Sequence, residues 1–160
     1  MSRTAIYPGS FDPFTFGHLD IIERGSKVFD RMIVAVAHNV SKKTTFTIDE
    51  RVELIGEVFK DNDNIEVDSF SGLLVDYIKS KGTNTVLRGM RSVSDFEYEM
   101  QMAHANKSLD PELETVFMVT SRKYSHISSS LIREIVSLGG SAADLVPGVI
   151  EKKLIQKLRK

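Results

Sequence analysis

The stretch YPGSFDPFTFGHLDII, residues 7–22, decides the fold class of this chain. It begins inside a short apolar run, Thr4–Tyr7, and continues through a loop that contains glycine and proline. It ends in a segment with amphipathic helical spacing, which His18 opens. A strand, a glycine-containing loop and a helix in this order are typical of α/β proteins that bind ligands where the strand ends. The stretch therefore predicts an α/β protein with a ligand site near its first loop.

The rest of the chain repeats this alternation of strand and helix. Helical spacing fits His18–Phe29, and two capping boxes, Thr47–Glu50 and Ser94–Glu97, predict helices that reach about Lys60 and Lys107. The other predicted helices are Leu73–Lys81, Ser129–Leu138 and Val149–Leu158, and the other predicted strands are Met32–Ala37, Ile65–Ser69, Thr85–Leu87 and Thr115–Val119. Apolar strands separated by helices predict a Rossmann-like α/β fold, in which a five-stranded parallel sheet carries helices on both faces.

Length and composition set limits on the class of protein. The 160 residues, 41% hydrophobic and 27% charged, fit a single domain, residues 1–160, without an apolar run that approaches the length of a membrane span. A formal net charge of −1 argues against a broad nucleic-acid-binding surface. The sequence has no cysteine and no signal-peptide pattern at its start, so we expect a cytoplasmic protein with neither nucleic-acid nor membrane partners.

Gly17 and His18 form the first candidate phosphate site. Glycine lets the backbone approach a ligand closely, and the first turn of a helix offers unpaired N–H groups with a partial positive charge. His18 could donate a further hydrogen bond to the same phosphate, or it could only cap a turn, and this stretch alone leaves both interpretations open. Asp12, which precedes Pro13, fits turn chemistry better than a metal site.

Three further segments that suit phosphate follow the second, fourth and fifth predicted strands. Ser41–Lys43 has two adjacent lysines, Arg88–Arg91 has two arginines around a glycine, and Ser128–Ser130 precedes a helix that contains Arg133. Taken singly, each segment also fits a solvated loop, a surface ion pair or an ordinary helix cap. Because the carboxyl ends of parallel strands share one edge of a sheet, we expect all four segments to meet at one phosphate site.

The sequence offers no arrangement for covalent catalysis. No serine–histidine–acid order or pair of catalytic carboxylates stands out, and the remaining histidines lack metal-ligand spacing, so we predict no metal site made by the protein. Met100 and Met102 fit packing. Loops that position phosphates and stabilise charge are enough for nucleotidyl transfer to a phosphate acceptor, because such an acceptor has no proton to lose. The residues therefore favour a nucleotidyltransferase.

Four segments, in this order and at this spacing, resemble the bacterial phosphopantetheine adenylyltransferases of the nucleotidyltransferase superfamily. They are YPGSFDPFTFGH (7–18), SKK (41–43), RGMRSVSDFEYEMQMAHAN (88–106) and YSHISSSLIRE (124–134), and the similarity extends to about Pro147. Thr15 stands where the wider superfamily commonly has the first histidine of a histidine-x-glycine-histidine motif. Threonine here is typical of the phosphopantetheine branch and counts against nicotinate mononucleotide adenylyltransferases and cytidylyltransferases.

This resemblance implies transfer of the adenylyl group of ATP to 4′-phosphopantetheine, giving dephospho-coenzyme A and pyrophosphate, with Mg²⁺ on the ATP phosphates. The implied catalytic residues are His18, which would steady the α-phosphate, Lys42 and Arg91. The implied acceptor-binding residues are Ser10, Lys42, Leu74 and Arg88. The implied ATP-binding residues are Ser10, Phe11, His18, Gly89, Met90, Arg91, Glu99, Tyr124, Ser125, His126, Ile127, Ser128, Ser129 and Ser130. The resemblance also implies a homohexamer that binds coenzyme A as a feedback inhibitor.

Two alternatives to this function remain open. The acceptor could be another phosphate, such as nicotinamide mononucleotide, or the chain could be a nucleotide-binding module that catalyses nothing. Formation of pyrophosphate distinguishes an enzyme from a binding module. Competition between acceptors distinguishes the two enzymes.

Overall fold

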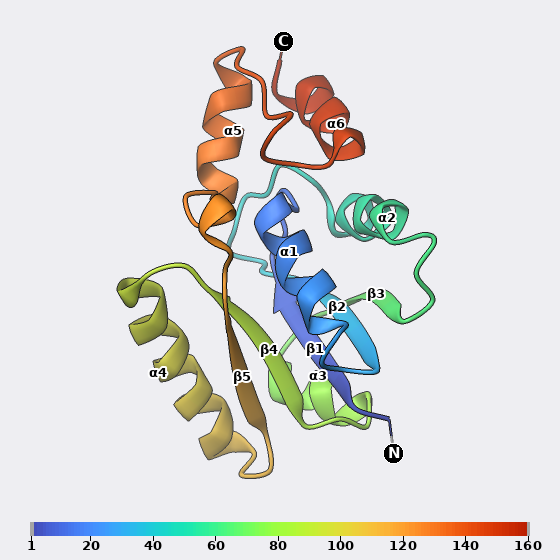
Figure 1. Cartoon of the computed structure of the whole chain (residues 1–160), viewed down its shortest axis with the longest axis vertical. Helices are drawn as coiled ribbons and strands as arrows, with labels where there is room; N and C mark the ends of the chain where they lie inside the picture. Colours follow the sequence, from blue (N-terminus) through green and yellow to red (C-terminus); the bar gives the residue numbers. More distant parts are fainter. Residues whose placement is uncertain (1, 160) are drawn as a thin grey trace.

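Five strands form one sheet in the order β3-β2-β1-β4-β5 (Figure 1). The computed structural model describes residues 2–159. The strands are β1 (Thr4–Gly9), β2 (Arg31–Ala37), β3 (Ile65–Phe70), β4 (Thr85–Met90) and β5 (Glu114–Val119). All neighbouring strands are parallel, and Ile6 of β1 is paired with Ile33 of β2 and with Val86 of β4. The predicted Rossmann-like parallel sheet is confirmed.

Helices cover both faces of this sheet. They are α1 (Phe16–Gly25), α2 (Ile48–Val58), α3 (Leu74–Ser80), α4 (Val93–Leu109), α5 (Ser129–Ser137) and α6 (Gly148–Leu158), with a 3₁₀ turn, η1 (Arg122–Tyr124). Buried apolar side chains of α1, α2, α5 and α6 form the larger core with one face of the sheet, and those of α3 form a smaller core on the other face. None of the helices within residues 2–159 is long and apolar enough to cross a bilayer.

The order of the strands reverses direction at β1. β2 and β3 lie on one side of β1, whereas β4 and β5 lie on the other. The connections that leave β1 and β4 therefore diverge, and this opens a crevice at the carboxyl ends of the strands. α5 and α6 lie together beyond the carboxyl ends of the strands, whereas α4 runs alongside β5 (Figure 1). The phosphate site predicted from the sequence falls at this crevice.

The capping boxes predicted for α2 and α4 had different outcomes. Thr47–Glu50 forms the predicted box: each of the two side chains accepts the backbone N–H of the other residue. The predicted box at Ser94–Glu97 is wrong, because Ser92 caps α4 and accepts the N–H of Asp95 at 3.2 Å. The N-cap serine therefore lies two residues earlier than expected.

Several large apolar side chains of α4 and β5 are exposed. They are Val93, Phe96, Tyr98, Met100, Met102, Leu109, Val116 and Val119, and helical spacing distributes those of α4 over two opposite sides of the helix. Met100 and Met102, which the sequence assigned to packing, are 38% and 41% exposed. Glu99 is the buried residue of this helix. Exposed apolar side chains on an edge strand and on the helix beside it are candidates for contact with other protein surfaces.

Candidate active site

The contacts that begin α1 also fix His18. The helix starts at Phe16 rather than at His18, with Thr15 as its N-cap. Thr15 Oγ1 accepts the backbone N–H of His18 at 3.3 Å, and Nδ1 of His18 accepts the backbone N–H of Thr15 at 3.0 Å. This is a reciprocal capping box with histidine in the place where glutamate or glutamine is usual. His18 therefore caps the helix through Nδ1 and keeps Nε2 for a ligand.

Three aromatic rings hold the imidazole in place. The ring centroids of Tyr7, Phe11 and Phe14 lie 6.3, 5.0 and 5.5 Å from that of His18. Phe11 has a φ of 49°, in the left-handed region, and its ring meets the imidazole edge-on at 83°. Such a backbone costs on the order of 1 kcal/mol for a residue other than glycine, and burial of the phenyl ring offsets that cost.

The surroundings of His18 keep its ring neutral. Burial, together with the positive charges of Arg88 and Arg91, lowers the pKa of His18 to about 3. Near neutral pH the imidazole is therefore uncharged, with Nδ1 as the acceptor and Nε2–H as the donor. A fixed neutral donor can stabilise charge that develops on a phosphate oxygen without giving up its proton.

We expect acidification to destabilise the fold through His18. In the unfolded chain its pKa returns to about 6.5. Between about pH 6.5 and pH 3, His18 is therefore protonated in the unfolded chain but neutral in the folded chain. The free energy of unfolding should therefore fall as the pH is lowered through this window. Above the window, the stability that the neutral His18 contributes should be fully present. Urea denaturation at pH 7 and pH 5 measures the loss. His18→Gln, which can still cap α1, should lose less stability on acidification, whereas an equal loss would contradict the lowered pKa.

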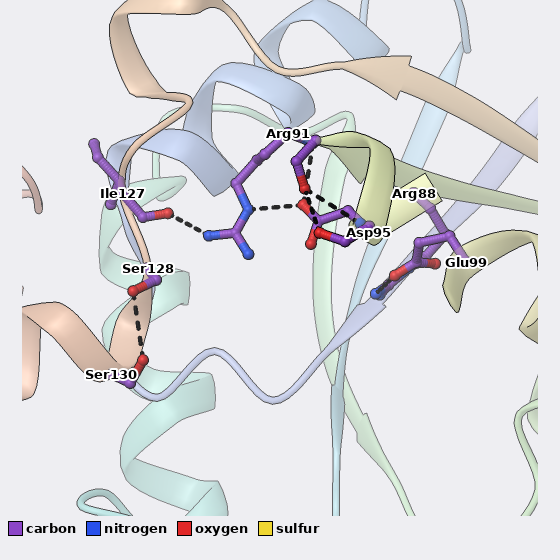
Figure 2. A network of polar contacts seen from close by, with 9 residues as sticks. Arg88, Arg91, Asp95, Glu99, Ile127, Ser128 and Ser130 are labelled. Carbon is purple, nitrogen blue, oxygen red and sulfur yellow. Dashed lines mark hydrogen bonds and ion pairs between the residues drawn. The ribbon is translucent and has the colours of Figure 1, made fainter. Parts of the chain in front are cut away.

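Arg88 and Glu99 form a two-pronged ion pair beside this histidine (Figure 2). Nε and Nη2 of Arg88 donate to the two carboxylate oxygens at 2.8 and 2.6 Å, and Nη1 donates to the carbonyl of Pro8. Burial alone would lower the pKa of Arg88, but the hydrogen bonds and charge of Glu99 raise it above its ordinary value. Arg88 is thus a permanent cation in one orientation. Two N–H groups of its guanidinium remain for a phosphate.

Arg91 joins the loops that follow β4 and β5 (Figure 2). Its Nε donates to Asp95 at the start of α4 at 3.0 Å, and its Nη1 donates to the carbonyl of Ile127 at 2.6 Å. The side chain is 39% exposed, so an anion can reach its remaining N–H groups. Arg91 therefore connects the two loops and also offers charge to a ligand.

The three serines at the start of α5 all contact protein atoms. Ser128 caps the helix by accepting the N–H of Leu131 at 3.3 Å, and its hydroxyl lies 3.4 Å from that of Ser130 (Figure 2). Ser129 donates to the carbonyl of Pro13 at 2.8 Å, which ties the start of α5 to the loop after β1. The first-turn N–H groups that no side chain uses remain available for an anion.

Asp20 fixes the turn between β5 and η1. Its Oδ2 accepts the backbone N–H and the hydroxyl of Ser121 at 3.2 and 2.8 Å, and it also pairs with Arg24 at 3.0 Å. Burial alone would raise the pKa of Asp20, but the hydrogen bonds from Ser121 and Arg24 outweigh it and hold that pKa below its usual range. The sequence analysis missed this residue because its partner lies 101 positions away.

Most of these groups line one cavity of about 600 Å³, whereas Asp20 and its partners lie outside the lining. The cavity brings together the four segments that the sequence predicted to meet, because the loops after β1, β2, β4 and β5 all contribute to it. The residues implied by the resemblance that line it are Ser10, Phe11, His18, Lys42, Arg88, Gly89, Arg91, Glu99, Ile127, Ser128, Ser129 and Ser130.

Five other implied residues do not line the cavity, namely Leu74, Met90, Tyr124, Ser125 and His126. Leu74 begins α3 and packs against the smaller core. The carbonyl of Met90 accepts the N–H of Thr120 at 2.8 Å, and the ring of Tyr124 lies 6.2 Å from that of Phe16. Ser125 bonds within η1, and His126 is exposed. Direct contact of these five residues with a ligand stays a prediction.

Three carboxylates line the cavity, and two of them are fully used. Both oxygens of Asp12 accept backbone N–H groups, and both oxygens of Glu99 accept from Arg88. Within residues 2–159, Oδ1 of Asp95 has no hydrogen bond, whereas its Oδ2 accepts from Arg91. No group of three His, Asp or Glu side chains in the described chain could hold a metal ion by itself.

Comparisons with known proteins agree with this geometry. A cytidylyltransferase-like family model matches residues 6–135. Phosphopantetheine adenylyltransferases of Clostridium novyi, Caldanaerobacter subterraneus subsp. tengcongensis and Geotalea daltonii are 58%, 52% and 52% identical over 158 residues, which cover 99% of this chain and 98%, 99% and 98% of theirs. This chain belongs to the phosphopantetheine adenylyltransferase family. The resemblance found in the four sequence segments is thereby confirmed.

The structure explains what threonine does at position 15, where the resemblance implied a feature of the phosphopantetheine branch. Its hydroxyl caps α1, and its N–H holds Nδ1 of His18. A histidine there would lack the short hydroxyl that accepts the first-turn N–H. In this phosphopantetheine adenylyltransferase, one small residue thus begins the helix and sets the tautomer of the pocket histidine.

Proposed function

We propose that this protein transfers the adenylyl group of ATP to 4′-phosphopantetheine, giving dephospho-coenzyme A and pyrophosphate. The proposal is supported by family membership over nearly the full length and by the single cavity that His18 lines together with Lys42, Arg88 and Arg91. A phosphorylated donor and a phosphorylated acceptor both need cations, and this cavity has them. We propose that residues 1–160 act as one nucleotidyltransferase domain.

The chemistry needs positioning and charge stabilisation. A phosphate oxygen of the acceptor attacks the α-phosphorus of ATP, the bond to the bridging oxygen breaks, and pyrophosphate leaves with the electron pair. The acceptor phosphate is already ionised at neutral pH, so no protein base has to remove a proton. The Nε2–H of neutral His18 would donate to an α-phosphate oxygen and stabilise the charge that gathers there.

The other groups divide between the two substrates. Lys42 and Arg88 would hold the acceptor phosphate, and Leu74 would lie near the pantetheine portion. Arg91, with the N–H groups and hydroxyls of Ser128–Ser130, would hold the ATP phosphates, as charge-assisted hydrogen bonds do elsewhere. The remaining ATP contacts that we propose are Ser10, Phe11, Gly89, Met90, Glu99, Tyr124, Ser125, His126 and Ile127.

Mg²⁺ would enter with ATP. This ion neutralises part of the triphosphate charge and commonly binds substrate phosphates plus one or two carboxylates. Asp95 fits that use because it lines the cavity and its Oδ1 has no hydrogen bond within residues 2–159. Asp12 and Glu99 do not fit, since both of their oxygens are already occupied.

We further propose a homohexamer in the cytoplasm, with coenzyme A as a feedback ligand. The proposal of self-association is supported by the large apolar side chains that α4 and β5 expose, since exposed apolar surface favours contact with other protein. Coenzyme A contains the pantetheine group of the acceptor and would compete for the same site. ATP is a cytoplasmic metabolite, which supports that compartment. Sedimentation analysis that finds only monomers would contradict the hexamer.

The deciding experiment measures pyrophosphate release from ATP in the presence of Mg²⁺ with each of two acceptors and without any acceptor. Release should require 4′-phosphopantetheine and should not occur with nicotinamide mononucleotide or with no acceptor. Release with nicotinamide mononucleotide alone would replace the proposed acceptor. Binding of ATP without any release would indicate a nucleotide-binding module instead of an enzyme.

A further inference from the structure

Asp12 joins the loop after β1 to the loop after β2. Its Oδ2 accepts the N–H of Thr45 at 2.8 Å, and its Oδ1 accepts the N–H of Phe46 at 2.9 Å. Asp12 is 6% exposed and Phe46 is 1% exposed, so the bond from Phe46 is buried, while the bond from Thr45 is partly buried. Hydrogen bonds from consecutive N–H groups to a buried carboxylate are charge-assisted and strong. They fix the backbone where the second loop rejoins the core.

The segment that carries Asp12 is itself held from two sides. Arg51 of α2, which is 4% exposed, donates to the carbonyl of Ser10 at 2.7 Å. Arg133 of α5 donates to the carbonyl of Asp12, and its Nη1 lies 4.0 Å from the Asp12 carboxylate. Residues 10–12 therefore form a rigid base between two helices, against which Asp12 can hold a less constrained loop.

The loop that carries Lys42 has few other attachments. The N–H of His38 donates to the carbonyl that ends β3 at 2.9 Å, and this bond holds the start of the loop. The next bonds are local: the N–H and hydroxyl of Ser41 donate to the side chain of Asn39 at 3.1 and 2.7 Å. Ser41 and Lys42 are both exposed. Asp12 thus holds the end of this loop nearest to the cavity.

We infer that Asp12 is a positioning residue that sets the place of Lys42 in the cavity. A lysine ammonium is a point charge on a flexible stem, so its effective concentration at a phosphate depends on how well its backbone is fixed. Asp12 acts through the Thr45 and Phe46 backbone and does not itself contact a substrate. The inference rests on the proposed function only for the identity of the phosphate that Lys42 meets.

Asp12→Asn tests this role. Asparagine keeps the shape, but its amide nitrogen would face one of the two N–H donors, so one bond is lost to a donor–donor contact. We expect the KM for 4′-phosphopantetheine to rise about tenfold, while kcat and the KM for ATP change by about twofold or less. Trypsin should also cleave after Lys42 and Lys43 about tenfold faster, because the loop opens more often.

A double-mutant cycle separates positioning from general stability. In a Lys42→Ala background, Asp12→Asn should raise the acceptor KM by a further factor of about two or less, because its effect acts through Lys42. Asp144→Asn, an exposed aspartate whose side chain makes no hydrogen bond within residues 2–159, is the matched control and should change neither KM nor cleavage.

The inference is overturned if Asp12→Asn raises both KM values equally, or if its effect adds fully to that of Lys42→Ala. Unchanged cleavage after Lys42 and Lys43 would also overturn it, since the loop would then not depend on Asp12. The cleavage comparison needs no substrate. It therefore remains a test of the contact even if the unmodified protein forms no pyrophosphate and the proposed function fails.

Discussion

His18→Ala is expected to lower kcat by about a thousandfold while changing the dissociation constant of ATP by about threefold or less. The imidazole is a neutral donor, held by the Thr15 N–H at 3.0 Å and surrounded by aromatic rings, so it is already aligned before ATP arrives. Its hydrogen bond should strengthen as charge builds up on the α-phosphate, and only such an interaction affects kcat more than binding.

Single-turnover kinetics and ATP titration of the same preparations measure the two quantities. His18→Gln is the control, because glutamine can keep the capping box and a donor N–H while changing the donor's reach. Its kcat should lie between those of the parent and of His18→Ala. If His18→Ala weakened ATP binding as much as it slowed turnover, His18 would be a ground-state contact and not a transition-state one.

Glu99→Ala is expected to lower the free energy of unfolding by about 3 kcal/mol and to raise the KM for 4′-phosphopantetheine about a hundredfold. Removing the carboxylate leaves the largely buried Arg88 guanidinium with only the Pro8 carbonyl among its present partners. Arg88 then loses both its orientation and the charge that compensates it. Urea denaturation and initial-rate kinetics measure the two effects.

The matched control replaces both partners. Arg88→Met/Glu99→Leu removes the pair without leaving a charge, so it should recover part of the lost stability while the acceptor KM stays high. Comparing the KM values for ATP and for the acceptor also distinguishes the two possible roles of Glu99, as a direct ATP contact and as the residue that orients Arg88. An unchanged acceptor KM, with a rise in the KM for ATP alone, would mean that Glu99 serves only as the proposed ATP contact and does not orient Arg88.

The parallel sheet and the meeting of four loops could be predicted because both depend on local patterns. Continuous apolar runs alternate with helical spacing, and the loops that follow parallel strands share one edge of the sheet. The box at Thr47–Glu50 was equally local and is confirmed. The box at Ser94–Glu97 failed because Ser92, two residues earlier, offers a competing cap that satisfies the same start of the helix.

The contacts that organise the site could not be predicted in this way. Asp12 bonds to residues 33 and 34 positions away, and Asp20 bonds to Ser121 across 101 positions. No periodicity links residues at such separations, because only the folded sheet brings them together. His18 was ambiguous for another reason: the capping bond uses Nδ1 and the proposed ligand contact would use Nε2, so the confirmed cap does not exclude that contact.

The capping box at Thr15 and His18 has a consequence for the entropy of the reaction. The orientation of the imidazole is fixed when α1 forms, because the contacts that hold it belong to the helix cap and need no nucleotide. Substrate binding therefore does not have to order this side chain, and that ordering commonly costs about 1 kcal/mol of affinity for each group. The His18 side chain is already ordered when the helix forms.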